Sequence, residues 1–116
     1  MLYQGSCHCG AIKFEAEGEL DHVVDCNCSY CSRKGGLLWF VPRASFKLHS
    51  GDDKLTVYRF NKHRIEHRFC ATCGCQPFAY AQDQKGGEVA AINARCLENV
   101  DLQRLKRHQY DGRSAQ

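Results

Sequence analysis

The chain has 116 residues, the usual length of one folded domain, so we expect a single domain over residues 1–116. Its residues are 43% hydrophobic and 25% charged, with only two prolines, and this composition excludes a disordered or low-complexity chain. The formal net charge of +3 is smaller than the excess that a nucleic-acid-binding module usually carries. We therefore expect no nucleic-acid partner.

The hydrophobic pattern shows no sign of membrane insertion or export. The longest apolar run, residues 37–41, is far shorter than the roughly 20 residues that a membrane helix needs. The first four residues lack the basic and apolar regions of a signal peptide. We therefore expect a cytoplasmic protein with no membrane partner.

Short β-strands separated by turns account for most of the predicted structure. Residues 11–17 alternate, with Ile12, Phe14 and Ala16 on one face and charged residues on the other. Trp39 lies in the apolar run after Gly-Gly, which predicts a buried strand and a core position for this ring. The expected strands are residues 11–17, 37–41, 55–60, 65–69, 77–81 and 88–95.

The segment after these strands has a different spacing. Val100, Leu102 and Leu105 are separated as on one face of a helix, so we expect one or two helical turns over residues 101–108. The sequence therefore predicts a mostly β fold with a short C-terminal helix or turn.

Nine cysteines are an unusual number for a chain of this length without an export signal. An odd number cannot pair completely within one chain, and in a reducing compartment such thiols more often bind metal. The cysteines form three groups and two single residues: Cys7 and Cys9; Cys26, Cys28 and Cys31; Cys70 and Cys73; and, apart from these, Cys75 and Cys96.

The first and last groups together offer four thiolates to one structural zinc. Cys70 and Cys73 have the spacing of a zinc knuckle, and Gly74 supplies the left-handed conformation that such turns need. Cys7 and Cys9 are too close in sequence for an unstrained disulfide, but their sulfurs can share a metal. The alternative is a pair of redox motifs in a thioredoxin-like protein, and the sequence has no βαβ unit to support it.

The middle group, Cys26, Cys28 and Cys31, offers three ligands to a second zinc. Three protein ligands with an exchangeable fourth position are typical of a catalytic or ligand-binding zinc. The alternative is a closed second site with Cys96, Cys75 or a histidine as the fourth ligand. Cys96 and Cys75 are also explained as small apolar residues that pack on strands. The spacing leaves these alternatives open.

A basic stretch runs from Arg59 to Arg68, beginning at the end of the predicted strand 55–60, and it has two interpretations. It is either an anion site, for carboxylates or phosphates, or a solvated strand face and turn. The residues of the basic stretch are Arg59, Lys62, His63, Arg64, His67 and Arg68.

Asn27 lies between two cysteines of the middle group. We expect its side chain either to point away from a metal bound there or to face the open side of that metal.

Three motifs follow one another along the chain: Gly5-Ser6-Cys7-His8-Cys9-Gly10, Cys26-x-Cys28-x-x-Cys31, and Phe69-Cys70-x-x-Cys73-Gly74 followed by Pro77-Phe78. These motifs and their order resemble those of the family of glutathione-dependent formaldehyde-activating enzymes, which includes centromere protein V. The segments at residues 93–97 and 110–113 resemble the centromere-protein-V-like branch.

The resemblance implies a β-tent fold of small antiparallel sheets, a structural zinc on Cys7, Cys9, Cys70 and Cys73, and a second zinc on the middle group. It also implies a carbon–sulfur lyase reaction in which glutathione and formaldehyde form S-(hydroxymethyl)glutathione. A nearby group would protonate the product oxygen, and His63, His67 and Tyr30 have suitable chemistry. The competing hypothesis is a non-catalytic, zinc-stabilised binding module.

Overall fold

The computed structural model describes residues 1–62 and 64–115, and these residues form two β-sheets. The smaller sheet has three strands in the order β1-β2-β5, and the larger has seven in the order β10-β3-β4-β9-β8-β7-β6. The prediction of a mostly β fold is confirmed. The strands are β1 (Leu2–Ser6), β2 (Lys13–Glu17), β3 (His22–Cys26), β4 (Leu38–Pro42), β5 (Phe46–Ser50), β6 (Leu55–Tyr58), β7 (Glu66–Cys70), β8 (Phe78–Gln82), β9 (Glu88–Asn93) and β10 (Lys106–Tyr110).

The helical elements are short and lie between or after the strands. Among the described helices, none is both long and apolar enough to cross a membrane. They are α1 (Cys31–Lys34), α2 (Gly112–Ala115) and the 3-10 turns η1 (Arg43–Ser45), η2 (Asp52–Lys54), η3 (Ala94–Cys96) and η4 (Leu102–Arg104).

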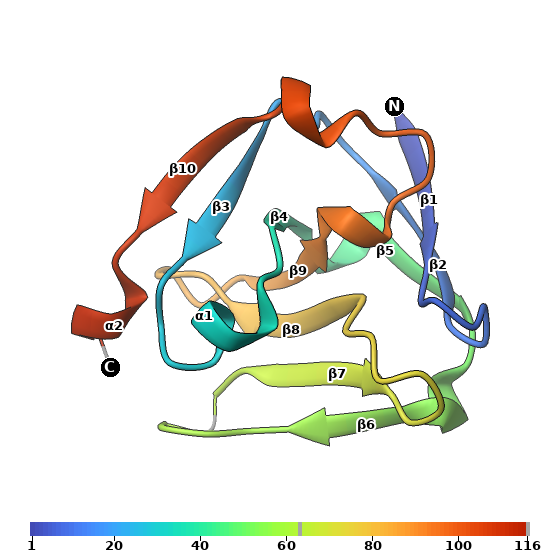
Figure 1. Ribbon diagram of the computed structural model, residues 1–116, viewed down its shortest axis with the longest axis horizontal. Helices are drawn as coiled ribbons and strands as arrows, with labels where there is room; N and C mark the ends of the chain where they lie inside the picture. Colours follow the sequence, from blue (N-terminus) through green and yellow to red (C-terminus); the bar gives the residue numbers. More distant parts are fainter. Residues whose placement is uncertain (63, 116) are drawn as a thin grey trace.

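The strands are arranged as two sloping sides above a base (Figure 1). The β1–β2 hairpin forms one side, and the pair of β3 and β10 forms the other, so the two meet at the top of the view. Strands β6 and β7 lie at the base. The turn after β1 and the loop after β7 lie together on the right, while α1 and α2 lie on the left.

Each of the six predicted strand segments contains a strand, but residues 101–108 differ from the prediction. Only Leu102–Arg104 form a helical turn there, and Lys106–Tyr110 form strand β10, which pairs in parallel with β3. The three apolar residues that suggested a helix still face the interior: Val100, Leu102 and Leu105 are partly buried against the core. Pairing with the free edge of β3 outweighs a helical preference that extends over only two turns. The short strands β1, β3 and β5 were not predicted.

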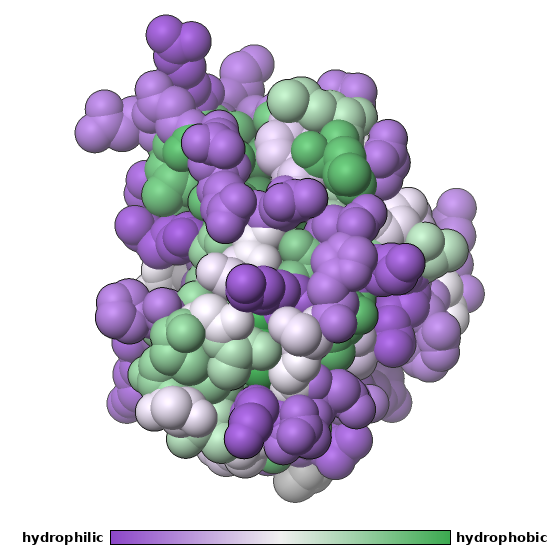
Figure 2. Space-filling view, turned by 90° about the vertical axis from the view of Figure 1, so that its right-hand side faces the viewer, coloured by the Kyte–Doolittle hydropathy of each residue, from purple (hydrophilic) through white to green (hydrophobic). Residues whose placement is uncertain are grey.

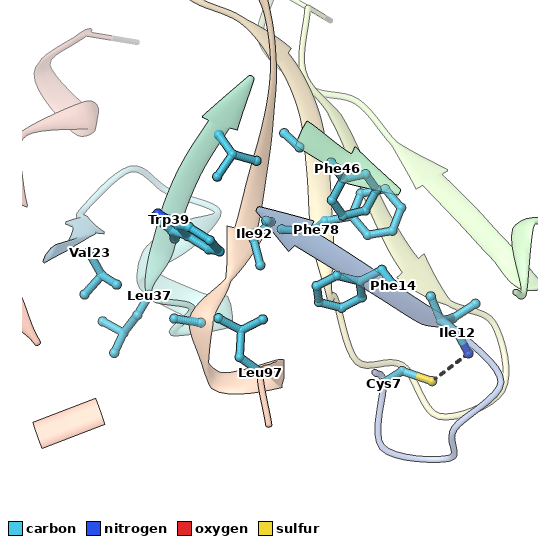
Figure 3. Packing of buried hydrophobic residues seen from close by; sticks show 14 of the residues in the cluster. Cys7, Ile12, Phe14, Val23, Leu37, Trp39, Phe46, Phe78, Ile92 and Leu97 are labelled. Atoms are coloured by element: carbon cyan, nitrogen blue, oxygen red, sulfur yellow. Dashed lines mark hydrogen bonds between the residues drawn. The ribbon is translucent and has the colours of Figure 1, made fainter. Parts of the chain in front are cut away.

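The core lies between the two sheets and is rich in aromatic rings (Figure 3). Phe46 of the small sheet packs on Phe78 of the large sheet with ring centroids 4.6 Å apart, and Phe14 stacks on Phe46 at 5.5 Å. Trp39 is also buried, as predicted, and its indole N–H donates to the carbonyl of Glu19 at 3.2 Å. The alternation predicted for residues 11–17 is confirmed, because Ile12, Phe14 and Ala16 are all buried.

The side of the molecule that carries the β1–β2 turn is largely hydrophilic (Figure 2). Apolar residues are visible between the charged and polar side chains, in a broad pale area at the lower left of the view and in smaller areas above it.

Candidate metal centres and the adjoining cleft

Four cysteines from two distant parts of the chain form the first cluster. Cys7 and Cys9 lie in the turn after β1, Cys70 ends β7, and Cys73 lies in the following loop. Their four sulfur atoms all lie within 4.8 Å of one another. The Cys7–Cys9 and Cys9–Cys70 sulfurs are 3.6 and 3.7 Å apart. A tetrahedral zinc with Zn–S bonds of about 2.3 Å separates its sulfurs by roughly 3.8 Å, so the cluster has the size of a four-thiolate metal site.

Local backbone structure orients these sulfurs. The N–H of Ile12 donates to Cys7 Sγ at 3.4 Å, as Figure 3 shows. The N–H of Thr72 donates to Cys70 Sγ, also at 3.4 Å. Gly74 follows the second turn with φ +80°, and no atom lies within 4 Å of the position where its Cβ would be. The glycine is therefore required by the backbone conformation and not by lack of space.

The four sulfurs of this cluster do not share the same electrostatic environment. The backbone N–H of Cys75 is the main group that lowers the pKa of Cys73, to about 5, and thus favours its thiolate. The N–H of Ala11 alone would lower the pKa of Cys9, but desolvation and the three neighbouring sulfurs raise it to about 11. A bound cation would remove this conflict, because it stabilises all four thiolates at once.

The second cluster consists of Cys26, Cys28 and Cys31, whose sulfurs also lie within 4.8 Å of one another. Cys26 ends β3, Cys28 lies in the loop, and Cys31 begins α1. The N–H of Cys28 donates to Cys26 Sγ at 3.4 Å, and the N–H of Cys31 donates to Cys28 Sγ at 3.3 Å. Burial raises the pKa of the Cys31 thiol, so this sulfur needs a cation to ionise at neutral pH.

Within residues 1–62 and 64–115, no fourth histidine, cysteine or carboxylate joins the second cluster. The structure places Cys96 elsewhere, with its sulfur 3.9 Å from the carbonyl oxygen of Gln76. Burial raises the pKa of Cys96 to about 12, and electrostatic interaction with the nearby Cys75, Cys7 and Cys73 adds to this effect. Cys96 therefore lies beside the first cluster, where it is partly buried against the core, as is Cys75.

A cleft of about 400 Å³ adjoins the second cluster, and all three of its cysteines line this cleft. Much of the remaining lining is apolar, and Phe40 lines the cleft while 47% exposed. Two cations, Lys62 and Arg64, line it as well. The other lining residues are Val24, Leu38, Phe60, Asn61, Ile65, His67, Gln76, Ala79, Ala81, Gln82, Asp83, Ala91, Tyr110, Gly112 and Ala115.

The basic stretch predicted near this site divides into two parts. Arg59 and Arg68 pair with Glu66, at 3.5 and 2.6 Å, and do not line the cleft. Lys62 and Arg64 do line it. His63, which the sequence suggested as a proton donor, lies outside the described residues. The anion-site interpretation is therefore restricted to the turn that leads into β7.

The C-terminal segment packs on the second cluster, a contact that the sequence did not predict. A Cβ on Gly112 would lie 2.5 Å from Cys26 Sγ. The side chain of Asn27 turns toward this segment: it donates to Asp111 at 3.1 Å and accepts from the N–H of Arg113 at 2.9 Å. Gln76 also lines the cleft and was not predicted to do so. Its position shortly after Cys73 in the sequence gave no indication of this role.

This architecture defines a small β protein with two cysteine clusters that could hold metal ions, one of them open to a cleft. Residues 2–112 match the sequence model of the family described as glutathione-dependent formaldehyde-activating enzyme. The chain therefore belongs to that family. It is also similar to a Rhodobacter sphaeroides protein of known crystal structure, with 28% sequence identity and a TM-score of 0.78. The match covers 90% of this chain and 99% of that one.

Proposed function

We propose that this protein is a zinc-dependent enzyme of the carbon–sulfur lyase type that condenses glutathione, or another thiol, with formaldehyde or a related aldehyde. The observation that carries the proposal is the second cluster. It presents three sulfurs to a cleft and has no fourth ligand among the described residues. Three protein ligands with a free position are the arrangement expected of a zinc that binds substrate.

The donor set supports zinc at both clusters. Thiolates are the ligands that structural and thiol-binding zinc sites use, and all nine cysteines are free in this structure. When bound, zinc would supply a Lewis acid that lowers the pKa of an incoming thiol. Free thiols in this number also support a reducing compartment, and we place the protein in the cytoplasm.

The cleft has a volume and charged side chains that suit the two proposed substrates. Its volume of about 400 Å³ falls in the range of small-ligand sites. Lys62 and Arg64 offer charges to the carboxylates of glutathione. In the reaction, the thiolate sulfur bonds to the aldehyde carbon and the C=O π electrons move to oxygen. That oxygen then takes up one proton from solvent, which replaces the proton that the thiol released.

A native mass spectrum of the zinc-loaded chain, with and without glutathione, tests this proposal. We expect two zinc ions and a glutathione adduct in the wild type, and loss of the adduct in Cys28→Ser. Cys75→Ser is the matched control, because Cys75 belongs to neither cluster, and it should retain the adduct. Two zinc ions without any adduct would instead favour a non-catalytic, zinc-stabilised binding module.

A further inference from the structure

His67 is a buried polar residue of β7 whose hydrogen bonding is incomplete. The residue is 6% exposed and lines the cleft. Its Nε2 atom is buried, and no described residue is its hydrogen-bond partner. Leaving such a group without a partner costs about 1–3 kcal/mol, and native proteins rarely tolerate it without a functional reason. The unpaired Nε2 therefore indicates a partner other than the described residues, such as a ligand in the cleft.

A chain of two hydrogen bonds determines which ring nitrogen carries the proton. The hydroxyl of Tyr30 donates to Gln76 Oε1 through a short hydrogen bond. The amide nitrogen of Gln76 therefore faces His67 Nδ1, at 3.4 Å. An amide nitrogen can only donate, so Nδ1 accepts and the proton of the neutral ring lies on Nε2. The free nitrogen of His67 is thus a donor.

The surroundings of the ring keep it neutral. The rings of Tyr30 and Phe60 lie 4.3 and 5.3 Å from the imidazole, and Phe60 is stacked on it. This burial is the main cause that lowers the pKa of His67 to about 4, and the charge of Lys34 adds to the effect. At neutral pH the ring is therefore an uncharged donor held in a fixed orientation.

We propose that the Nε2–H of His67 donates a hydrogen bond to the oxygen of the aldehyde bound in the cleft, and that Gln76 and Tyr30 are the positioning residues that hold this tautomer. The inference rests on the proposed function and adds a residue to it. When sulfur bonds to the carbonyl carbon, negative charge develops on the oxygen. A neutral imidazole stabilises that charge without giving up its proton, so the product oxygen is protonated from solvent.

The tautomer is tested first, by nitrogen-15 NMR of the full chain labelled at histidine. The His67 resonances are assigned as those missing from His67→Gln. We expect the Nε2–H tautomer in the wild type and a change toward a mixture of tautomers in Tyr30→Phe and Gln76→Leu. Tyr58→Phe is the matched control, because this ring stacks on Tyr30 but takes no part in the described hydrogen-bonded chain. An Nδ1–H tautomer in the wild type would overturn the inference.

The donor role is tested by the rate of S-(hydroxymethyl)glutathione formation, followed by carbon-13 NMR with labelled formaldehyde. Loss of one donor to a developing oxyanion costs roughly 100-fold in rate, so His67→Gln should lose about that factor while still binding glutathione. Gln76→Leu leaves the imidazole in place and should also slow the reaction, which keeps the test valid if His67→Gln folds poorly. An active wild type with an equally active His67→Gln would refute the donor role alone, whereas an inactive wild type would refute the proposed function.

Discussion

The side-chain amide of Asn27 donates to the carboxylate of Asp111 at 3.1 Å, although 84 positions separate the two residues. Asn27 lies between two cysteines of the second cluster, and Asp111 lies between β10 and α2. The N–H of Arg113 donates in turn to the carbonyl oxygen of the Asn27 side chain. One asparagine therefore connects the cysteine loop to the C-terminal segment that lines the cleft.

Removal of this link should loosen the C-terminal segment. In Asp111→Ala, we expect the amide of Ser114, which donates to Asp111 Oδ1, to exchange hydrogen about fivefold faster, the effect of losing one ordinary hydrogen bond. Hydrogen exchange measured by mass spectrometry on residues 110–115 checks this prediction. Asp101→Ala is the control, because Asp101 accepts from Gln103 in a similar exposed turn away from the cluster. If residues 110–115 exchanged hydrogen at the same rate in Asp111→Ala as in Asp101→Ala, the prediction would be contradicted.

The substitution Gly112→Ala should disturb the second cluster while the fold remains intact. A Cβ at this position would lie 2.5 Å from Cys26 Sγ and 3.1 Å from Cys28 Cβ, so one of these cysteines must move. We expect metal content measured by native mass spectrometry to fall from two ions to one. Gly36→Ala should retain both ions, because its Cβ would meet Asn93 at an ordinary 3.5 Å. Unchanged metal content in Gly112→Ala would show that the segment does not press on the site.

The contribution of the first cluster to stability is best tested at Cys9, which is exposed and has no core packing to lose. Metal binding in such domains contributes about 10 kcal/mol or more, comparable to the whole stability of a small domain. We expect Cys9→Ser to lose one metal ion and its cooperative thermal transition, as measured by circular dichroism. Cys75→Ser serves as control and should still melt cooperatively. A thermal transition of Cys9→Ser close to that of the wild type would show that a metal at this cluster has no structural role.

The buried histidine also makes stability depend on pH. The pKa of His67 is about 4 in the folded protein and 6.5 ordinarily, so the unfolded chain binds a proton first as pH falls. The stability that the neutral, buried His67 contributes is therefore complete above pH 6.5 and is lost as the pH falls toward 4. Over that window, the wild type should lose up to about 3 kcal/mol more free energy of unfolding than His67→Gln. Denaturant titrations at several pH values check this, and parallel profiles for the two proteins would contradict it.

Local spacing in the sequence was sufficient to predict several features of this protein. The alternation at residues 11–17 places Phe14 in the core, because side chains in a strand alternate strictly between its two faces. The grouping of the cysteines was equally local. Sulfurs two or three positions apart in a tight turn are held close together whatever the rest of the fold does, and backbone N–H groups point at them.

Tertiary structure alone decided the features that depend on distant pairing. Strand β10 replaces the predicted helix because the free edge of β3 offers backbone partners that the helical pattern does not reveal. Cys96 lies by the first cluster because Gly5 forms a bridge with Leu97, which brings η3 toward the Cys7 turn. The link from Tyr30 through Gln76 to His67 joins the residue before α1, a loop and β7. Residue spacing along the chain carries no information about such contacts, because they form only when the sheets pack.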